Sequence, residues 1–546
     1  MNITRFFLRS PLATAVAAFA FGVTGALAAD DSGAVQGVVT NAAGQPVTGA
    51  FVKLKNAERR LTFMVISQAN GAFNAANLPA GVYTLQGVGE GFESVISAPV
   101  NVASGNGVRQ TLSLARARGP LLPPAWPQRI PEAQQAAVSK DYPAGPNHDL
   151  VVEKCGTCHN SDRVVVKRTD RDDWGHIVTR MRTRMVAANM ADIANDDANK
   201  ISDYLAANFS PLQPRDPNNR LPTTLMQGKA LKYRAVTYDL ANKYAEPHDV
   251  AMDPQGNAWV AERAGKLGRW DPRTLEFVEK TVPPGSAPPD RQSLGNPQID
   301  SKGVLWVADG PNGRWLSFDT KTDASIAFAW PKALGNAGGN SMAVHPDGTI
   351  WATGANKEIR VLDPQKIAFK SYESPSAKGK HLPGAYGVAV AGDGSVWWAQ
   401  DEADSMVRID PATGKMDEYK IPYQGRAFPR RMNSDANGDL WVALWLAGKL
   451  MKIDHKTREM TIYTPPSQTG GNYSVIVDKQ NNFIWVSEHQ VDKIARFDPK
   501  TLEWVEFPLP ESESDPRRID IDPLNPNRVF FSGNSPGRMG FVEVLP

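Results

Sequence analysis

The chain has few of the features that stabilise small exported proteins or anchor membrane proteins. Its 546 residues include only two cysteines, Cys155 and Cys158, which excludes a disulfide-rich scaffold. No run of eighteen apolar residues follows the first thirty positions, so no ordinary transmembrane helix is expected there. The formal net charge is only +2, which gives no whole-chain field for nucleic acid or an anionic membrane.

The first 28 residues have the pattern of an export signal. Arg5 and Arg9 precede an apolar run from Leu12 to Val23, and Ala26-Leu27-Ala28 supplies small residues at a cleavage site. The apolar run is too short to span a membrane stably. We therefore expect a mature protein that begins at Ala29, is exported to the periplasm and does not span a membrane.

Both cysteines belong to one motif, Cys155-Gly-Thr-Cys158-His159. C-x-x-C-H is typical of covalent haem attachment, in which two thiols bind one haem and the adjacent histidine ligates its iron. A disulfide or half of a metal site would also use a C-x-x-C pair, but the histidine and the export pattern favour haem. The motif predicts one haem c, with His159 as the proximal iron ligand.

The segment around the motif, residues 148–210, has helical periodicity. Its apolar residues form one helical face: Trp174, Ile177, Val178, Met181 and Met185. The segment resembles class I cytochromes c through C-x-x-C-H, Trp174 and Ile201-x2-Tyr204-Leu205. The resemblance implies a small all-α domain that exchanges electrons with a periplasmic donor or acceptor protein.

The same resemblance implies a distal iron ligand, usually methionine, just before the last helix. Met190 fits that place, although Ala191 stands where the family usually has proline. Met185 and Met181 are alternatives, because related domains carry an Arg-Met pair on the preceding helix, and His176 is a weaker candidate. A methionine ligand would suit electron transfer, whereas a vacant position would suit ligand binding.

Residues 33–115 contain short alternating strands separated by turn signals, which predicts a small β-sandwich. They resemble the carboxypeptidase regulatory-like domain family through Val38-x5-Gly44-x-Pro46, Asn70-Gly71-x-Phe73 and Leu78-Pro79-Ala80-Gly81-x-Tyr83. The resemblance implies an immunoglobulin-like or transthyretin-like module without a catalytic constellation. A proline-rich linker, residues 116–147, follows it.

Residues 221–546 form a repeat array. Each unit has a tight turn followed by a tryptophan strand, and the anchors recur every 44 to 47 residues: Trp259, Trp306, Trp351, Trp397, Trp441 and Trp485, with Phe530 in a degenerate seventh unit. This period predicts a seven-bladed β-propeller. The last unit lacks an outer strand, which residues 233–239 can supply to close the ring.

The array resembles the virginiamycin B lyase (streptogramin lyase) family through its Asp-Gly-x-x-Trp turns and strands such as Lys266-Leu267-Gly268-Arg269. Lyases of the resembled family use a histidine, a glutamate fourteen residues later and a histidine three residues further, with Mg²⁺. The resemblance implies the same three positions in this chain. His248 and Glu262 match the first spacing, but Gly265 stands at the third position. Lyase activity is therefore an alternative hypothesis with an incomplete set of residues.

The inner-strand ends of a propeller surround its central opening, and several here are polar. His248, with Glu262 and the arginines Arg430, Arg431, Arg517 and Arg518, is a candidate site for a small anionic substrate or for docking of the haem domain. Three hypotheses follow. The protein is a periplasmic electron-transfer protein whose propeller binds a redox partner or small substrate, a propeller lyase, or a binding scaffold on the cell envelope.

Overall fold

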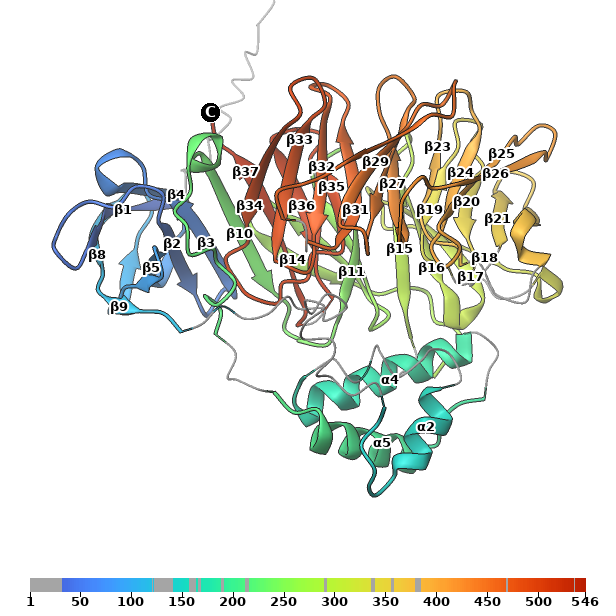
Figure 1. Cartoon of the computed structure of the whole chain (residues 1–546), viewed down its shortest axis with the longest axis horizontal. Helices are drawn as coiled ribbons and strands as arrows, with labels where there is room; N and C mark the ends of the chain where they lie inside the picture. The colour runs from blue at the N-terminus through green and yellow to red at the C-terminus, as the bar shows by residue number, and fades with distance from the viewer. Residues whose placement is uncertain are drawn as a thin grey trace, which may run out of the picture.

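The structure is a computed structural model that describes residues 32–119, 121, 141–156, 164, 168–187, 191–211, 216–288, 292–334, 339–354, 358–378, 384–467, 470–534 and 536–546. A sandwich, a β-propeller and a small helical unit make up this part of the chain (Figure 1). The export pattern, Cys158, His159 and Met190 lie outside the described residues. The predicted mainly β, multidomain architecture is confirmed.

The sandwich has the expected β topology. Its strands are β1 (Ser32–Asn41), β2 (Phe51–Asn56), β3 (Leu61–Ile66), β4 (Ala72–Pro79), β5 (Gly81–Gly89), β6 (Phe92–Glu93), β7 (Val100–Val102), β8 (Gly107–Leu114) and β9 (Arg116–Ala117). One sheet has the order β4-β1-β8, and the other contains β3-β2-β5-β6-β9 with β7 beside β5. β9 extends the sandwich into the first two residues of the predicted linker.

The predicted Asn-Gly turn joins β3 to β4. Asn70 has φ 59° and Gly71 has φ 68°, a left-handed conformation that asparagine and glycine adopt most readily. The turn lies in the 3-10 helix η1 (Ala69–Gly71). It reverses the chain so that the alternating apolar residues Phe73 and Ala75 enter the core with Val35 and Val39.

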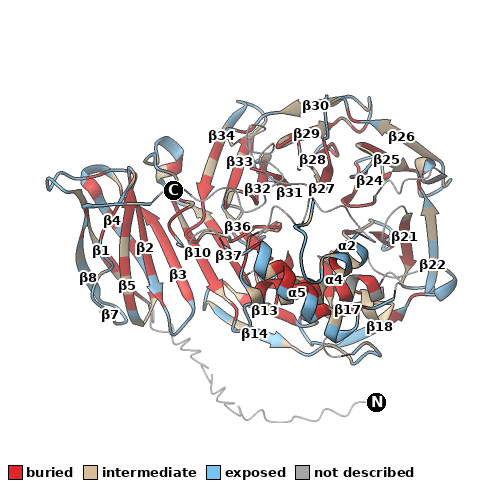
Figure 2. Cartoon of the chain, turned by 60° about the horizontal axis from the view of Figure 1, so that its bottom comes forward, coloured by how far each residue is buried: buried red, intermediate tan, exposed pale blue. Residues whose placement is uncertain are grey.

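The propeller has six four-stranded sheets and a seventh that uses β10, within the described residues. The six are β11 (Pro247–Met252), β12 (Ala258–Glu262), β13 (Leu267–Asp271), β14 (Glu276–Lys280); β15 (Leu294–Ile299), β16 (Val304–Asp309), β17 (Arg314–Asp319), β18 (Ser325–Ala329); β19 (Met342–Val344), β20 (Ile350–Thr353), β21 (Glu358–Asp363), β22 (Ala368–Glu373); β23 (Val388–Val390), β24 (Val396–Gln400), β25 (Ser405–Ile409), β26 (Met416–Lys420); β27 (Pro429–Ser434), β28 (Leu440–Leu444), β29 (Lys449–Ile453), β30 (Met460–Tyr463); and β31 (Asn472–Asp478), β32 (Phe483–Glu488), β33 (Lys493–Asp498), β34 (Glu503–Pro508). The first strand of each sheet contacts the next around the ring, and β35 contacts β11, so the ring closes (Figure 2).

In each of the first five blades, a side chain of the turn accepts the indole N–H of the anchor tryptophan. In the first blade the Asp253 carboxylate accepts the backbone N–H groups of Gln255 and Asn257 and, at 2.8 Å, the indole N–H of Trp259. Asp435 does the same for Trp441 in the fifth blade. This carboxylate satisfies both the turn and a buried indole. In the third and fourth blades the hydroxyls of Thr349 and Ser395 accept the indole N–H instead.

The seventh blade closes as predicted. It contains β35 (Arg518–Ile521), β36 (Arg528–Ser532), β37 (Arg538–Val544) and, as its outer strand, β10 (Tyr233–Asp239). β10 pairs with β37 antiparallel, with Tyr233 opposite Val544. Its other edge pairs with β3 of the sandwich, with Tyr238 opposite Leu61. One continuous sheet therefore joins the sandwich to the propeller, and no edge of β10 is left open.

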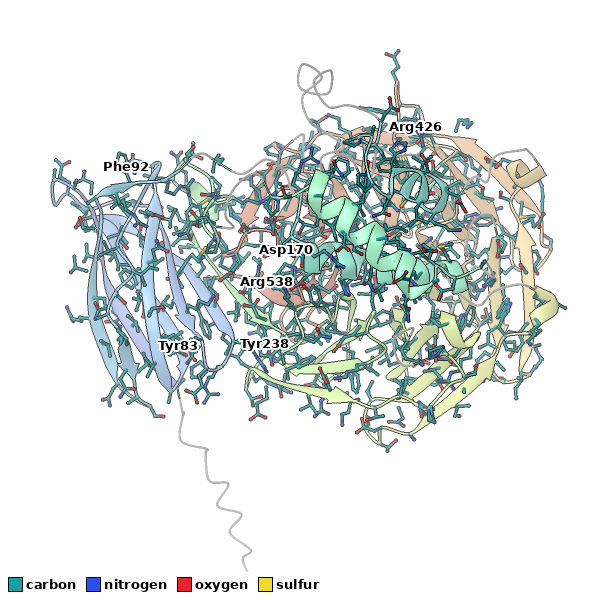
Figure 3. All side chains as sticks on the ribbon, turned by 90° about the horizontal axis from the view of Figure 1, so that it is seen from below. Tyr83, Phe92, Asp170, Tyr238, Arg426 and Arg538 are labelled. Carbon is teal, nitrogen blue, oxygen red and sulfur yellow. The ribbon has the colours of Figure 1, made fainter. Side chains whose placement is uncertain are left out.

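Buried charges lie where the sandwich meets the propeller; Figure 3 labels Tyr238 and Arg538 there. Thr62 Oγ1 donates to Glu511 Oε1 at 2.9 Å, and Arg538 Nη2 lies 3.2 Å from Glu511 Oε2. Lys53 is buried beside them and donates to Asn218 Oδ1 at 3.1 Å. This polar contact fixes the two bodies together in addition to the shared sheet.

Among the described residues, the helical unit has three α-helices: α2 (His148–Cys155), α4 (Arg171–Ala187) and α5 (Asn195–Asn208). Their apolar residues pack in one cluster that includes Val151, Trp174, Met185 and Ile201. Tyr142 joins this cluster, with its ring 6.4 Å from that of Tyr204. Among the helices described, none combines the length and the apolar character that crossing a bilayer requires.

Candidate functional site

The beginnings of the inner strands gather at one end of the propeller channel. We call this end the mouth; it comprises His248, Arg430, Arg431, Tyr473 and Arg517, with the residues that contact them. The helical unit lies over the same end (Figures 1 and 2). Its helix α4 contacts the 3-10 helix η5 (Gly310–Asn312), which directly follows β16, the second strand of the second blade.

A buried carboxylate connects α4 to the mouth. Glu246, two residues before His248, is fully buried and accepts from His176 Nε2 at 2.9 Å and from Arg180. The His176 ring also stacks on Tyr244 with centroids 4.6 Å apart. Burial alone would raise the pKa of Glu246, but Arg180 and His176 lower it to about 2. His176, the weak candidate for an iron ligand, is thus engaged with the propeller.

His248 is a buried, neutral imidazole. Its Nδ1 lies 3.2 Å from Asp249 Oδ2, and its Nε2 lies 3.5 Å from the Tyr473 hydroxyl. Burial lowers the pKa of His248 to about 3 in spite of Asp249. Asp249 in turn forms an ion pair with Arg431 and accepts the backbone N–H of Asn296 at 3.1 Å.

Two tyrosines and two arginines pack next to His248. The Tyr386 and Tyr473 hydroxyls are hydrogen-bonded to each other. The Arg430 guanidinium lies 4.1 Å from the Tyr386 ring centroid, and that of Arg517 lies 4.8 Å from the Tyr473 centroid. Burial would raise the pKa of Tyr473, but Arg517, Arg430 and Arg431 lower it. Burial raises the pKa of Tyr386, so Tyr473 is the more acidic of the two phenols.

His489 completes the mouth from the sixth blade. Trp445 Nε1 donates to His489 Nε2 at 2.5 Å, so His489 Nδ1 carries the proton and donates to Asp515 Oδ1 at 2.6 Å. Arg517 pairs with the other oxygen of Asp515 at 2.9 Å. Burial lowers the pKa of His489 to about 4, which keeps this tautomer neutral.

Glu262 and Glu488 occupy equivalent places at the ends of β12 and β32, three residues after the anchor tryptophans. Both are buried, and Glu262 Oε1 and both Glu488 oxygens have no hydrogen-bond partner in the structure. Burial, with the charge of Glu279, raises the pKa of Glu262 to about 8, and burial raises that of Glu488. The Glu262 carboxyl group is therefore protonated at neutral pH.

The incomplete lyase set remains incomplete in three dimensions. Gly265 lies in a turn with φ 81°, and a Cβ atom there would approach Gln292 Cβ to 2.2 Å. A histidine at this position requires the turn to move. In the described part of the chain, no three His, Cys, Asp or Glu side chains are grouped so as to hold a metal ion.

The helical unit carries the part of the haem motif that is described. Cys155 is the last residue of α2 and is half-buried against the apolar cluster. Met185 is buried within that cluster, and Met181 lies one turn earlier on α4, partly buried. Cys158, His159 and Met190 lie outside the described residues.

The residues that the sequence analysis missed are the acidic partners of the mouth. Glu246 and Asp515 were not singled out, although each stands two residues before a predicted site residue, His248 and Arg517 respectively. Trp445, which fixes the His489 tautomer, was also missed. Only a search for acidic residues beside the inner-strand starts could have suggested the first two.

Comparison with known proteins supports both β domains. Residues 298–544 match the Virginiamycin B lyase family, and residues 34–115 match the Carboxypeptidase regulatory-like domain. A comparison with curated protein sequences found no significant match.

Solved structures of lyases share the propeller fold. Selenomethionine-substituted virginiamycin B lyase from Staphylococcus aureus is 17% identical with a TM-score of 0.50, covering 57% of this chain and 100% of that one. A streptogramin B lyase structure is 20% identical with a TM-score of 0.51, covering 58% and 100%. A catalytically inactive histidine-to-alanine variant of the S. aureus enzyme with quinupristin is 17% identical with a TM-score of 0.50, covering 57% and 100%. The chain therefore contains a virginiamycin B lyase-like β-propeller and a carboxypeptidase regulatory-like domain.

Proposed function

We propose that this protein is an exported electron-transfer protein. It carries one covalent haem c on Cys155 and Cys158, in the helical unit that covers the mouth of the propeller. The observation that carries the proposal is the contact of this motif-bearing unit with the mouth, through the buried Glu246 and its partners His176 and Arg180. A redox group bound in the helical unit would lie close to the mouth of the propeller.

The residues of the helical unit fit a haem c. Two thiols and an imidazole in C-x-x-C-H form the donor set that haem c uses, and Cys155 lies at the edge of an apolar cluster of helices. His159 would bind the iron on one side. Met190, or alternatively Met185 or Met181, would bind it on the other. When bound, the haem supplies reversible one-electron chemistry.

The propeller and the contacts of α4 have distinct roles in this proposal. Glu246, His176 and Arg180 position the helical unit at the mouth. The mouth then presents neutral imidazoles and arginines to a small anionic substrate, while the outer face of the helical unit is left to a periplasmic donor or acceptor protein.

The test is spectroscopic and uses the full chain, produced in a bacterial periplasm with haem-attachment enzymes. We expect a c-type α-band on reduction and one haem per chain. Cys155→Ala should weaken haem retention, and Met416→Leu, a matched change on β26 far from the helical unit, should leave the spectrum unchanged. A protein without covalent haem would overturn the proposal.

The distal ligand is assigned by the methionine-to-iron charge-transfer band. Met190→Leu should abolish this band, whereas Met185→Leu and Met181→Leu should retain it. Loss of the band in one of the latter two variants would move the assignment to that methionine.

A second candidate function is a lyase of the virginiamycin B type. The family match and the spacing of His248 and Glu262 on neighbouring strands favour it, and the absent third residue at Gly265 weighs against it. The assay is Mg²⁺-dependent ring opening of quinupristin. Ring opening that is lost in Glu262→Gln would establish this second function, and its absence in the wild-type protein would exclude it for that substrate.

A further inference from the structure

The sandwich and the helical unit are joined to the propeller in different ways. Apolar residues of the sandwich share two cores with the propeller: Leu61 belongs to one core with Tyr238, and Phe51 belongs to the other with Tyr233. The apolar cluster of the helical unit lies within residues 142–209, and none of its described members belongs to the propeller. Domains that meet without a shared apolar core commonly move relative to one another. The helical unit can therefore leave the propeller without opening its own core.

A small polar contact, which we call the latch, holds α4 against the mouth. It comprises His176 and Arg180 on α4, and Tyr244 and Glu246 just before the first blade. Both hydrogen bonds end on one atom, Glu246 Oε1, while Glu246 Oε2 has no hydrogen-bond partner in the structure. The Glu246 side chain is fully buried, whereas that of His176 is 22% exposed. The charge of a single carboxylate therefore holds both side chains of α4.

The chain segments that lead to and from the helical unit are fixed to each other at one place, which we call the hinge. The guanidinium of Arg118, on the way in, donates to the backbone oxygens of Asn218 at 3.1 Å and Leu221 at 2.9 Å, on the way out. Arg220, between these two residues, donates to the backbone oxygen of Gln490 at 2.7 Å. The helical unit therefore leaves and rejoins the rest of the protein at one anchored point.

The hinge and the latch lie at different blades. Gln490 follows β32 of the sixth blade, and Ser512, which donates to the backbone oxygen of Asp216 at 2.9 Å beside the hinge, precedes the seventh blade. Glu246 precedes β11 of the first blade. The helical unit lies over the end of the propeller between these places (Figures 1 and 2). Rotation about such a hinge can break the latch while the hinge contacts stay in place.

We propose that the helical unit is a lid on the mouth of the propeller, and that it opens about the hinge when the latch breaks. In the closed position, which this structure shows, His176 and Arg180 occupy the Glu246 carboxylate. In the open position the mouth is uncovered and this carboxylate is free. The proposal goes beyond the electron-transfer function and does not depend on the haem, because the polypeptide alone forms the hinge and the latch.

The test uses the full chain and drives the lid open with Arg180→Glu, which places two carboxylates in contact at the latch. His176 reports the position of α4, because its Nε2 is hydrogen-bonded to Glu246 in the closed lid. Peptide mass spectrometry measures the rate at which diethyl pyrocarbonate modifies His176, relative to His148 on α2 of the same unit. This ratio should rise by about tenfold or more in Arg180→Glu, because like charges in contact are strongly unfavourable.

Small-angle X-ray scattering of the same samples distinguishes an open lid from the loosening of one side chain. The radius of gyration should increase in Arg180→Glu. Arg171→Glu is the matched control on the same helix, because Arg171 is exposed and pairs with Asp203 inside the helical unit. Both readouts should keep their wild-type values in this control.

A second variant keeps the test decisive if Arg180→Glu does not fold, as judged by its helical circular dichroism. Arg180→Gln removes the cation of the latch without adding a charge, and both readouts should change in the same direction. A folded variant with wild-type values of both readouts, or with faster modification of His176 at an unchanged radius of gyration, would overturn the proposal. Neither readout uses the haem spectrum, so a failed haem assay and a failed lid are distinguishable.

Discussion

The contact between Glu246 and α4 allows a quantitative prediction. Glu246→Gln removes the buried charge that Arg180 and His176 face, while keeping the shape of the side chain. The pKa of Glu246 falls from an ordinary 4.5 to about 2. At 1.36 kcal/mol per pKa unit, that difference corresponds to about 3 kcal/mol of stabilisation, or on the order of 100-fold in the docking equilibrium.

The pH dependence of this contact follows from the depressed pKa. The stabilisation is present above about pH 4.5 and is lost as the pH falls towards 2, because the carboxylate must be protonated there. Acidification to pH 3 should therefore loosen α4 in the wild-type protein. In Glu246→Gln this acid-dependent step should be absent.

Hydrogen exchange followed by mass spectrometry measures the effect. We expect the backbone amides of α4 to lose up to about 100-fold of their protection at pH 7 in Glu246→Gln, with little change in the outer blades. Glu276→Gln, an exposed glutamate on β14, is the matched control. Equal protection of α4 in the wild type and in Glu246→Gln would refute the assignment of Glu246 as the docking carboxylate.

Three further predictions concern the β domains. Glu511→Ala removes the carboxylate that the buried Lys53 and Arg538 share, although Arg538 keeps its ion pair with Asp239, so we expect a loss of about 3–5 kcal/mol in the free energy of unfolding, measured with urea; a loss below 1 kcal/mol would contradict the buried-network interpretation. Asp253→Ala removes the acceptor of the turn and of the Trp259 indole, which should cost about 1–3 kcal/mol and lower the melting temperature. Glu262→Gln should match the wild type near pH 4 and then exceed its stability increasingly as the pH rises from 4.5 to about 8, by up to about 5 kcal/mol; stability curves that stay parallel over this range would show that Glu262 is not a buried acid.

Local repeats made it possible to predict the propeller from the sequence. The turn residues and the tryptophan of an anchor act within a few residues of one another, as Asp253 and Trp259 do, so their spacing alone predicts turn and strand. The closing role of β10 could also be predicted, because the last repeat unit has only three strands of its own and one strand precedes the first unit. Its second pairing, with β3 of the sandwich, could not, since either edge of a strand can accept a partner.

The candidate site was predictable only in part. His248 and the arginines were recognised because they begin inner strands, and every blade repeats that position. Their partners come from distant segments: Arg431 reaches Asp249 across 182 positions, and the Tyr473 hydroxyl reaches His248 across 225. No periodicity in the sequence encodes such pairs. His176 was considered for the iron, and its contact with Glu246 depends on how two bodies dock.

The amino-acid sequence by itself determined the local structure of this protein: the repeat period, the turns, the helical periodicity near Cys155 and the C-x-x-C-H motif that predicts a haem. These features depend on neighbouring residues and on the chemistry of side chains in short motifs. Only the tertiary structure decided that the helical unit covers the mouth, that β10 joins two domains, and that Arg431 meets Asp249 across the channel. Those outcomes depend on burial, because the pKa of Glu246 and the neutrality of His248 arise only where folding removes water from groups far apart in the chain.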